Sequence, residues 1–332
     1  MKIQYQSIKL SPGSLAIVAQ ANKILSEYSR RGIVVTLRQL YYQFVSRDII
    51  PNKQTEYKRL GSIINDARLA GLIDWDLMQD RTRNLEKLAH WDTPGGVIES
   101  AAHSYHRDLW EGQDNYVEVW VEKDALLSVI ERPCNEWDVP FFACRGYTSQ
   151  SEMWSAGQRL LGKIREGRNA KIIHLGDHDP SGVDMTRDIE SRLRMFISHH
   201  RLRDYAKAIP QKDNETEGDF LTRVGKQDYD SCLEVNRVAL NMDQVREYNP
   251  PPNPAKITDS RAGGYVAEHG DESWELDALG PDVLIELIET TVQEYLDVDL
   301  WQEKKSQQEE ERKVLNEASA HWESVAEFLS ER

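Results

Sequence analysis

Cysteine is scarce in this chain of 332 residues, which contains only three. The number of cysteines is odd, and no two of them form a CxxC pair; they are Cys134, Cys144 and Cys232. We therefore expect neither a disulfide framework nor a thiolate zinc site. Long apolar runs are also missing: no stretch approaches the ~18 residues of a membrane span. The start, MKIQYQSIKL, lacks the apolar segment of a signal peptide. We therefore expect a cytoplasmic protein without a membrane partner.

Positive charge is in short supply as well, because the formal net charge is −15. The net charge is unevenly distributed along the chain. Residues 1–90 contain 14 Lys and Arg against 8 Asp and Glu, a balance of +6, so the remaining 242 residues carry −21. A basic N-terminal module on an acidic body can mark where a polyanion docks. Ordinary solvated helices with a slight Arg excess explain the same numbers equally well.

The N-terminal third shows helical periodicity. Apolar residues at helical spacing predict a helix over residues 12–31, a second after the N-cap-like Thr36, and a third after Pro51 that Gly71 ends. The stretch LIDWDLMQDRTR then favours a short strand or ribbon. Three helices followed by a ribbon is the order of a winged helix-turn-helix, with NDARLAGL as the candidate recognition helix. We assign residues 1–110 to this winged-helix domain.

The middle of the chain has the pattern of a parallel sheet. Val117, Val119 and Val121 predict a strand that leads at Glu122 into a helix, and two more strand–helix units follow at residues 139–161 and 170–190. Strands that alternate with helices of this length predict an α/β fold with a parallel, doubly wound sheet, assigned to residues 111–298. Residues 299–332 form a charged C-terminal helix, whose final apolar stripe either packs on the body or makes a dimer contact.

Three acidic residues end predicted strands. Glu122 follows the first strand, and Asp177 and Asp179 follow the third in the sequence GDHDPSG. Ligands of open parallel sheets bind at the carboxyl ends of the strands, so these acids are expected at one crevice. Clustered carboxylates repel one another unless a cation neutralises them or one acid holds a proton, and all-oxygen ligands suit Mg²⁺, with Mn²⁺ as a substitute. Taken alone, the DxD pair is equally typical of surface acids at a turn.

These motifs resemble a known family. The stretches VWVEKDALLSVI and IIHLGDHDPSG look like the TOPRIM domain of topoisomerases, bacterial primases and several nucleases. GDxDPSG downstream of a helical module is most similar to the A-type subunit of topoisomerase VI and its relatives, which include the meiotic double-strand-break protein. TLRQLYYQF at 36–44 resembles the tyrosine motif of that family's winged helix. The resemblance covers residues 33–80 and 115–190; beyond about residue 200, ESWELDAL is similar only to phage, plasmid and bacterial TOPRIM proteins.

The resemblance implies roles for individual residues. Tyr42 would be the nucleophile, and Glu122, Asp177 and Asp179 would hold Mg²⁺, with Glu122 also able to exchange a proton with the reacting oxygens. In the family, the tyrosine of one protomer works with the acids of the other, which implies a homodimer that cuts double-stranded DNA. Strand passage would need a separate GHKL-type ATPase subunit, because this chain has no ATPase domain. Gln at position 39 replaces the acidic residue of the family.

Basic residues supply candidates for phosphate binding. Arg38, one turn before Tyr42, and Arg145, after the second strand, are expected at the reacting phosphate. The remaining candidates for DNA contact lie in the winged helix or in the segment AKITDSRAGG; they are Arg59, Arg68, Arg81, Arg83, Lys256 and Arg261. For each one singly, a solvated surface role explains the sequence as well as a phosphate contact does. Glu275 and Asp277 in WELDAL add a second polar cluster.

Three functions follow from these readings. The first is a nucleoid-associated, Mg²⁺-dependent DNA-cleaving enzyme of the topoisomerase VI A type, with Tyr42 as nucleophile. The second is a TOPRIM nuclease that uses metal-activated water and needs only the three acids. The third is a non-catalytic DNA-binding or replication-accessory protein. Tyr41 and Tyr42 also have a plain structural reading as core residues of an amphipathic helix, in which one is buried and the other less so.

Overall fold

The computed structural model describes residues 2–78, 88–208, 211–212, 215–216, 218–220, 232–256 and 259–331. The chain divides into two compact units, one of residues 1–81 with 116–292 and one of residues 82–115 with 293–332. We describe each unit by itself. The predicted domain boundaries after residues 110 and 298 do not coincide with these limits, and they stay predictions.

Three helices open the first unit: α1 (Pro12–Ser29), α2 (Leu37–Ser46) and α3 (Gln54–Leu69). The expected start of α2 is confirmed, because Thr36 and Gln39 form a capping box that satisfies free amides of the first turn. Gly32, with a φ of 70°, ends the turn after α1 in a conformation that suits glycine. The apolar stripes of the three helices meet in one core that includes Ile24, Phe44 and Leu60.

Within residues 72–78, the described part of the ribbon expected at residues 72–83, the structure has no strand; residues 79–83 lie outside the described residues. Residues Trp75–Leu77 form a short 3₁₀ helix, η1, because the Asp74 side chain accepts the amide hydrogen of Asp76 at 3.0 Å and favours a turn. Met78 makes one isolated parallel bridge to Val35. The structure therefore supports N-terminal helices here, while their assignment as a winged helix stays a prediction.

A four-stranded parallel sheet forms the centre of the first unit. Its strands are β1 (Asn115–Val121), β2 (Phe141–Ala143), β3 (Asn169–Leu175) and β4 (Leu233–Ala239), in the order β2-β1-β3-β4. The last five residues of β1 and the last four of β3 are all buried. Continuous burial of this kind means that both faces are covered, as parallel sheets require. The predicted α/β fold with a parallel sheet is confirmed.

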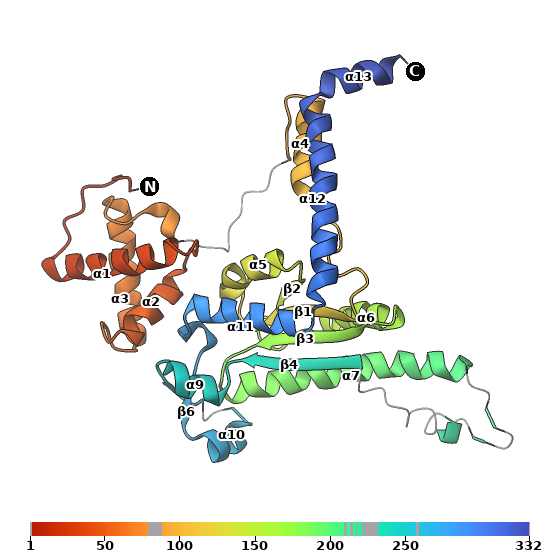
Figure 1. The fold of residues 1–332 in the computed structure, drawn as a ribbon. Coiled ribbons are helices and arrows are strands. Elements are labelled where there is room, and N and C mark those ends of the chain that lie inside the picture. The colour runs from red at the N-terminus through yellow and green to blue at the C-terminus, as the bar shows by residue number, and fades with distance from the viewer. Residues whose placement is uncertain are drawn as a thin grey trace. The chain divides into compact units, whose positions relative to one another are not determined.

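Helices follow each of the first three strands. They are η2 (Asp124–Leu126) with α5 (Leu127–Glu136), then α6 (Gln150–Arg165) and α7 (Pro180–Ala208). Side chains of α6 and α7 share a core with Trp120, Ala170 and Ile172 of the sheet. Figure 1 shows α7 running alongside β4, and the two elements are in contact.

Short elements link the sheet to the end of the first unit. They are α9 (Met242–Tyr248), β5 (Asn253–Pro254), α10 (Ala262–His269), β6 (Glu272–Ser273), η4 (Leu276–Ala278) and α11 (Pro281–Glu294). β5 and β6 form an antiparallel pair. Trp274 then bridges to His178, which places the residues after β6 beside the loop between β3 and α7.

The second unit contains α4 (Pro94–Ser104), α12 (Val298–Ala320) and α13 (Trp322–Ser330). Figure 1 shows α4 alongside α12, and the pair is joined by the Arg107–Glu311 ion pair at 2.8 Å. A Cβ at Gly95 would lie 3.2 Å from the Cβ of Trp322, so glycine permits this close approach. The charged C-terminal helix is confirmed, although it is divided between α12 and α13. No helix among the described residues combines the length and apolar character needed to cross a membrane.

His174 provides a test of the buried core of the first unit. The side chain on β3 is fully buried, its Nδ1 lies 2.8 Å from the Thr186 hydroxyl, and burial lowers the pKa of the imidazole to about 3 from 6.5. Between those pH values the unfolded chain binds a proton that the folded chain does not. The His174 contribution to stability is therefore complete above pH 6.5 and is lost as the pH falls toward 3.

We expect the unfolding free energy of the wild type to fall more steeply than that of His174→Asn as the pH falls from about 6 to about 4. The slopes should differ by about 1.4 kcal/mol per pH unit, the free energy of one proton per unit. Urea unfolding followed by circular dichroism measures both slopes, and equal slopes would contradict a neutral, buried His174.

Candidate functional site

Three acidic residues follow the carboxyl ends of β1 and β3. Glu122 comes directly after β1, and Asp177 and Asp179 lie between β3 and α7. The Asp177 amide donates a hydrogen bond to Glu122 Oε2 at 2.8 Å, which joins the two loops. We call these three residues the acid edge. They lie where parallel strand order predicts them.

Burial dominates the electrostatics of the acid edge. Asp177 and Asp179 are only 6% and 7% exposed. Burial raises the pKa of Glu122 to about 7, and the charges of Asp177 and Asp179 add to the rise. The pKa of Asp177 is also raised, chiefly by burial, against the opposing effect of the Lys123 ammonium. The Lys123 ammonium therefore compensates only part of the negative charge of the acid edge.

Asp179 caps helix α7. Its Oδ1 accepts the amide hydrogen of Gly182 at 2.7 Å and both the amide and hydroxyl of Ser181 at 3.0 Å. Burial alone would raise the pKa of Asp179, but these hydrogen bonds outweigh it and lower the pKa below its usual value. Glycine is required at position 182, because a Cβ there would lie 2.2 Å from the Asp177 carbonyl oxygen.

Asp177 is paired with protein groups. Its Oδ1 lies 2.7 Å from Lys123 Nζ and accepts the amide hydrogen of Leu276 at 2.8 Å. Lys123 Nζ also lies 3.0 Å from Asp277 Oδ1 and 3.1 Å from Glu275 Oε2. One ammonium therefore holds three carboxylates from two distant parts of the chain.

The acid edge is not arranged as a metal ligand set. Within the described ranges, no group of three or more His, Cys, Asp or Glu side chains could hold a metal ion. The reason is visible in the contacts: Asp177 faces Lys123, and the Oδ1 of Asp179 is used by the first turn of α7. The donor chemistry suits Mg²⁺, but the geometry does not, and the metal assignment stays a prediction.

Tyr42, the predicted nucleophile, lies on α2, and the Arg38 guanidinium beside its ring pairs with Glu275 and Asp277. Burial raises the pKa of the phenol well above its ordinary value, and the charges of Asp277 and Glu275 raise it further. The expectation that only one tyrosine of the pair is buried is wrong, since Tyr41 and Tyr42 are each 4% exposed. Residues of η4, which contacts α2, account for this double burial.

Tyr41 has a structural role. Its hydroxyl donates to Asn52 Oδ1 at 3.0 Å and to the Lys53 carbonyl at 3.2 Å, which closes the turn between α2 and α3. Its ring makes edge contacts with the rings of Tyr42 and Tyr57. These contacts agree with the prediction that Tyr41 packs in the core.

Arg38 is held by acids. Its guanidinium donates to Glu275 Oε2, and its Nε lies 2.6 Å from Asp277 Oδ2. The same guanidinium lies 5.9 Å from the centre of the Tyr42 ring. Arg38 thus neighbours Tyr42 as its position one turn earlier predicts, but its charge is already neutralised by residues 275–277.

Arg237 on β4 organises the loop that carries Asp177 and Asp179. Its guanidinium donates to the carbonyl oxygens of Gly176 at 3.1 Å, Asp177 at 2.6 Å and Gly182 at 2.9 Å. The Leu240 carbonyl and the Thr186 hydroxyl accept further hydrogen bonds from it, at 3.2 and 2.9 Å. A single half-buried cation therefore fixes the backbone on both sides of the acidic turn.

The other basic candidates are dispersed. Arg145 is 76% exposed in its side chain and pairs with Asp124 at 2.8 Å, while the next residue, Gly146, donates its amide hydrogen to the Glu122 carbonyl at 3.4 Å. Lys256 Nζ lies 3.4 Å from Asp179 Oδ2 with its side chain 73% exposed. Arg261 pairs with Asp259 at 2.7 Å and Asp184 at 3.1 Å, and it also contacts the Tyr147 hydroxyl. Of these three, Lys256 directly contacts the acid edge.

The candidates on the N-terminal helices are used within their own module. Arg59 pairs with Glu56 at 2.5 Å. Arg68 lies 4.3 Å from the Trp75 ring and donates to the Trp75 carbonyl at 3.1 Å, and burial lowers its pKa. Arg81 and Arg83 lie outside the described residues.

Sequence reasoning assigned no role to Lys123 or Arg237. Lys123 had a signal, because it follows Glu122 directly at the end of a strand. Arg237 had a weaker one: a lone cation between apolar residues of the strand VNRVAL. Neither pattern predicts which residue the side chain contacts, because Lys123 and Arg237 both contact Asp177, more than 50 residues away in the sequence.

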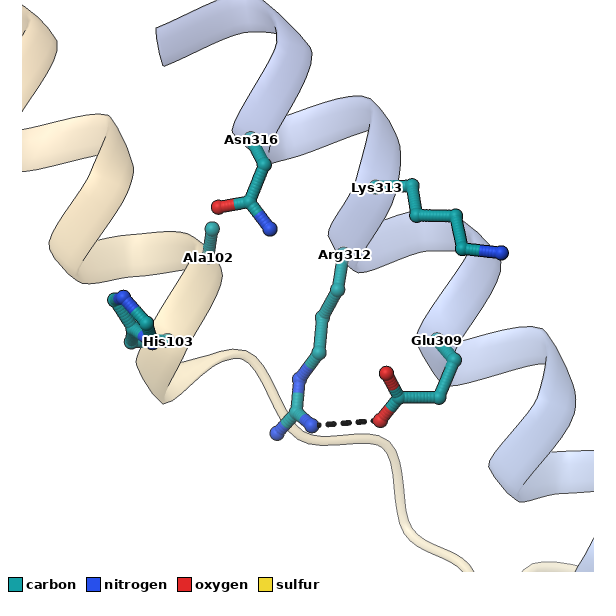
Figure 2. Close-up of a pocket in the computed structure, with 6 residues that line it drawn as sticks. All are labelled: Ala102, His103, Glu309, Arg312, Lys313 and Asn316. Carbon is teal, nitrogen blue, oxygen red and sulfur yellow. Dashed lines mark hydrogen bonds and ion pairs between the residues drawn. The ribbon is translucent and has the colours of Figure 1, made fainter. Parts of the chain in front are cut away.

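A cavity of about 230 Å³ lies in the second unit between α4 and α12. Figure 2 shows the six side chains that line it and the ion pair between Arg312 and Glu309; they are Ala102, His103, Glu309, Arg312, Lys313 and Asn316. Arg312 also donates to the Tyr105 carbonyl at 2.9 Å. The cavity contains none of the predicted site residues.

The fold and the site together define an α/β protein with a four-stranded parallel sheet, flanked by helices, and a buried acid edge at the ends of β1 and β3. No protein-family model matches the sequence, and no curated protein matches it either.

We expect Arg237→Met to lower the unfolding free energy by about 3 kcal/mol, because it leaves the carbonyl groups of Gly176, Asp177 and Gly182 without their donor. Arg246→Met is the matched control on α9, since Arg246 and its partner Asp243 have side chains that are 70% and 94% exposed. It should change stability by no more than about 0.5 kcal/mol. Urea unfolding compares the two variants, and equal losses would contradict a scaffolding role for Arg237.

Proposed function

We propose that this protein cleaves phosphodiester bonds of double-stranded DNA at the acid edge, with a divalent cation as cofactor. The observation that carries the proposal is the placement of Glu122, Asp177 and Asp179 at adjoining carboxyl ends of two neighbouring parallel strands. The exposed Lys256 beside Asp179 adds a cation that can meet a phosphate. This combination, with the resemblance of the N-terminal helices to a winged helix and of the sheet to a TOPRIM domain, favours DNA over a small substrate.

The first route uses Tyr42. A bond forms between the phenol oxygen and phosphorus, and the bond from phosphorus to the 3′ oxygen of the deoxyribose breaks. The phenol loses its proton to solvent or a carboxylate, and the leaving oxygen gains one. The phosphotyrosine link keeps the phosphodiester energy, so resealing is the reverse reaction. Because the phenol is buried and burial raises its pKa, this route requires that the hydroxyl become accessible to the phosphate.

The second route uses water. The burial of Tyr42 favours it, because a side chain that is 4% exposed is not accessible to a phosphate. Hydrolysis needs only the acid edge and leaves no covalent adduct. A non-catalytic DNA-binding role is the third reading, and the existing protein partners of Asp177 and Asp179 favour it.

Mg²⁺ or Mn²⁺ is the proposed cofactor, because the three carboxylates offer the oxygen ligands that these ions prefer. By resemblance, the active form is a homodimer, and strand passage would involve a separate GHKL-type ATPase subunit. A nucleoid-associated, cytoplasmic location follows from the same proposal.

Incubation with supercoiled plasmid and Mg²⁺ or Mn²⁺ tests the proposal. Denaturing gels, run with and without protease digestion, separate nicks, double-strand breaks, relaxation and covalent adducts. We expect Asp179→Asn to lower cleavage by at least about 10²-fold, as removal of one electrostatic group does elsewhere. Asp243→Asn, at a side chain 94% exposed on α9, is the control and should cleave like the wild type.

Tyr42→Phe separates the routes. Loss of both cleavage and adduct supports the tyrosine nucleophile, whereas full cleavage without adduct supports activated water. DNA binding by the wild type without any metal-dependent cleavage would overturn both routes and support the non-catalytic reading.

A further inference from the structure

The N-terminal helices contact the C-terminal part of their own unit at several points. Arg31 pairs with Asp282 at 2.7 Å. Asn52 Nδ2 donates to Asn253 Oδ1 at 2.9 Å. Ala278 of η4 is 5% exposed and is part of the core formed by α1, α2 and α3. An ion pair, an amide pair and a shared apolar core therefore hold these helices against residues 253–282 of the same chain.

Residues 275–277, which we call the anchor segment, join the two halves of the candidate site. Glu275 accepts a hydrogen bond from Arg38 of α2, whose guanidinium lies 5.9 Å from the centre of the Tyr42 ring. The Leu276 amide donates to the Asp177 carboxylate at 2.8 Å. One side of the segment therefore contacts the tyrosine helix, and the other contacts the acid edge.

Two cations complete the connection. Lys123 lies within 3.1 Å of Glu275, Asp277 and Asp177, and Arg38 pairs with Glu275 and Asp277 from α2. The Asp277 side chain is 1% exposed. A buried carboxylate that loses its cation is strongly destabilised, so Arg38 and Lys123 are held to the anchor segment together.

We infer that Tyr42 and the acid edge of one chain belong to a single site, assembled in cis by Glu275 and Asp277 as positioning residues. This inference rests on the proposed function and departs from the resemblance, which implies that each tyrosine serves the acids of the partner protomer. The network leads from the Tyr42 ring through Arg38, Glu275 and Lys123 to Asp177 without leaving the chain.

Hybrid dimers of two differently tagged chains test the inference. In the first hybrid, one chain carries Tyr42→Phe and the other Asp179→Asn, a change outside the anchor segment. In the second, a wild-type chain is paired with a chain that carries both substitutions. Tandem affinity purification isolates each hybrid, and plasmid cleavage is measured with Mg²⁺.

A cis site predicts no cleavage by the first hybrid and about half of the wild-type activity for the second, which keeps one intact site of two. The reverse result, activity in the first hybrid and none in the second, would overturn the inference. If no hybrid forms because the chain is monomeric, cleavage that rises linearly with protein concentration supports a cis site, and a quadratic rise contradicts it.

A cross-linking measurement decides the point without activity. Asn52→Cys with Asn253→Cys places a thiol on each side of the contact, for joining by a short bismaleimide, while Cys134, Cys144 and Cys232 are buried and serve as the background in the unsubstituted chain. A cross-linked monomer on denaturing gels supports docking in cis; a cross-linked dimer overturns it. Absence of wild-type cleavage would refute the proposed function and leave this result standing.

Discussion

The Lys123 ammonium is the interaction on which the first unit depends. It lies within 3.1 Å of carboxylates from residues 177, 275 and 277, so the end of β1, the loop after β3 and the segment before α11 meet at one positive charge. Three acids this close and this buried would repel one another without a cation between them. The same charge that stabilises the fold also occupies Asp177, and for this reason the acid edge is not a ligand set in the described arrangement.

Arg237 stabilises the same loop through its main chain. Lys123 neutralises side chains, whereas Arg237 satisfies main-chain carbonyl groups on both sides of the acidic turn. With the cap that Asp179 places on α7, these contacts hold the sequence GDHDPSG in one conformation. A rigid turn of this kind presents acids at a constant position, which is what a site for phosphate chemistry needs.

Several helices and strands could be predicted from the sequence. The Thr36 cap of α2, the helix after Pro51 and the strands that end at Val121 and Leu175 follow from patterns within a few residues. Within the ribbon expected at residues 72–83, residues 75–77 form a 3₁₀ helix because the Asp74 side chain stabilises a turn. The burial of Tyr42 was missed because a helix pattern shows which faces are apolar, but not that η4 covers a second face.

The sequence by itself determined the first three helices, the first three strands and the positions of the acids at strand ends, since helix periodicity, caps and strand patterns are properties of neighbouring residues. Only the tertiary structure decided which charges meet. Lys123 and Glu275, or Arg237 and Gly176, are separated by more than 60 residues, and no local pattern records such a pairing. Whether Asp177 faces a lysine, and whether Tyr42 lies against the acids of its own chain, depends on how those distant segments fold together.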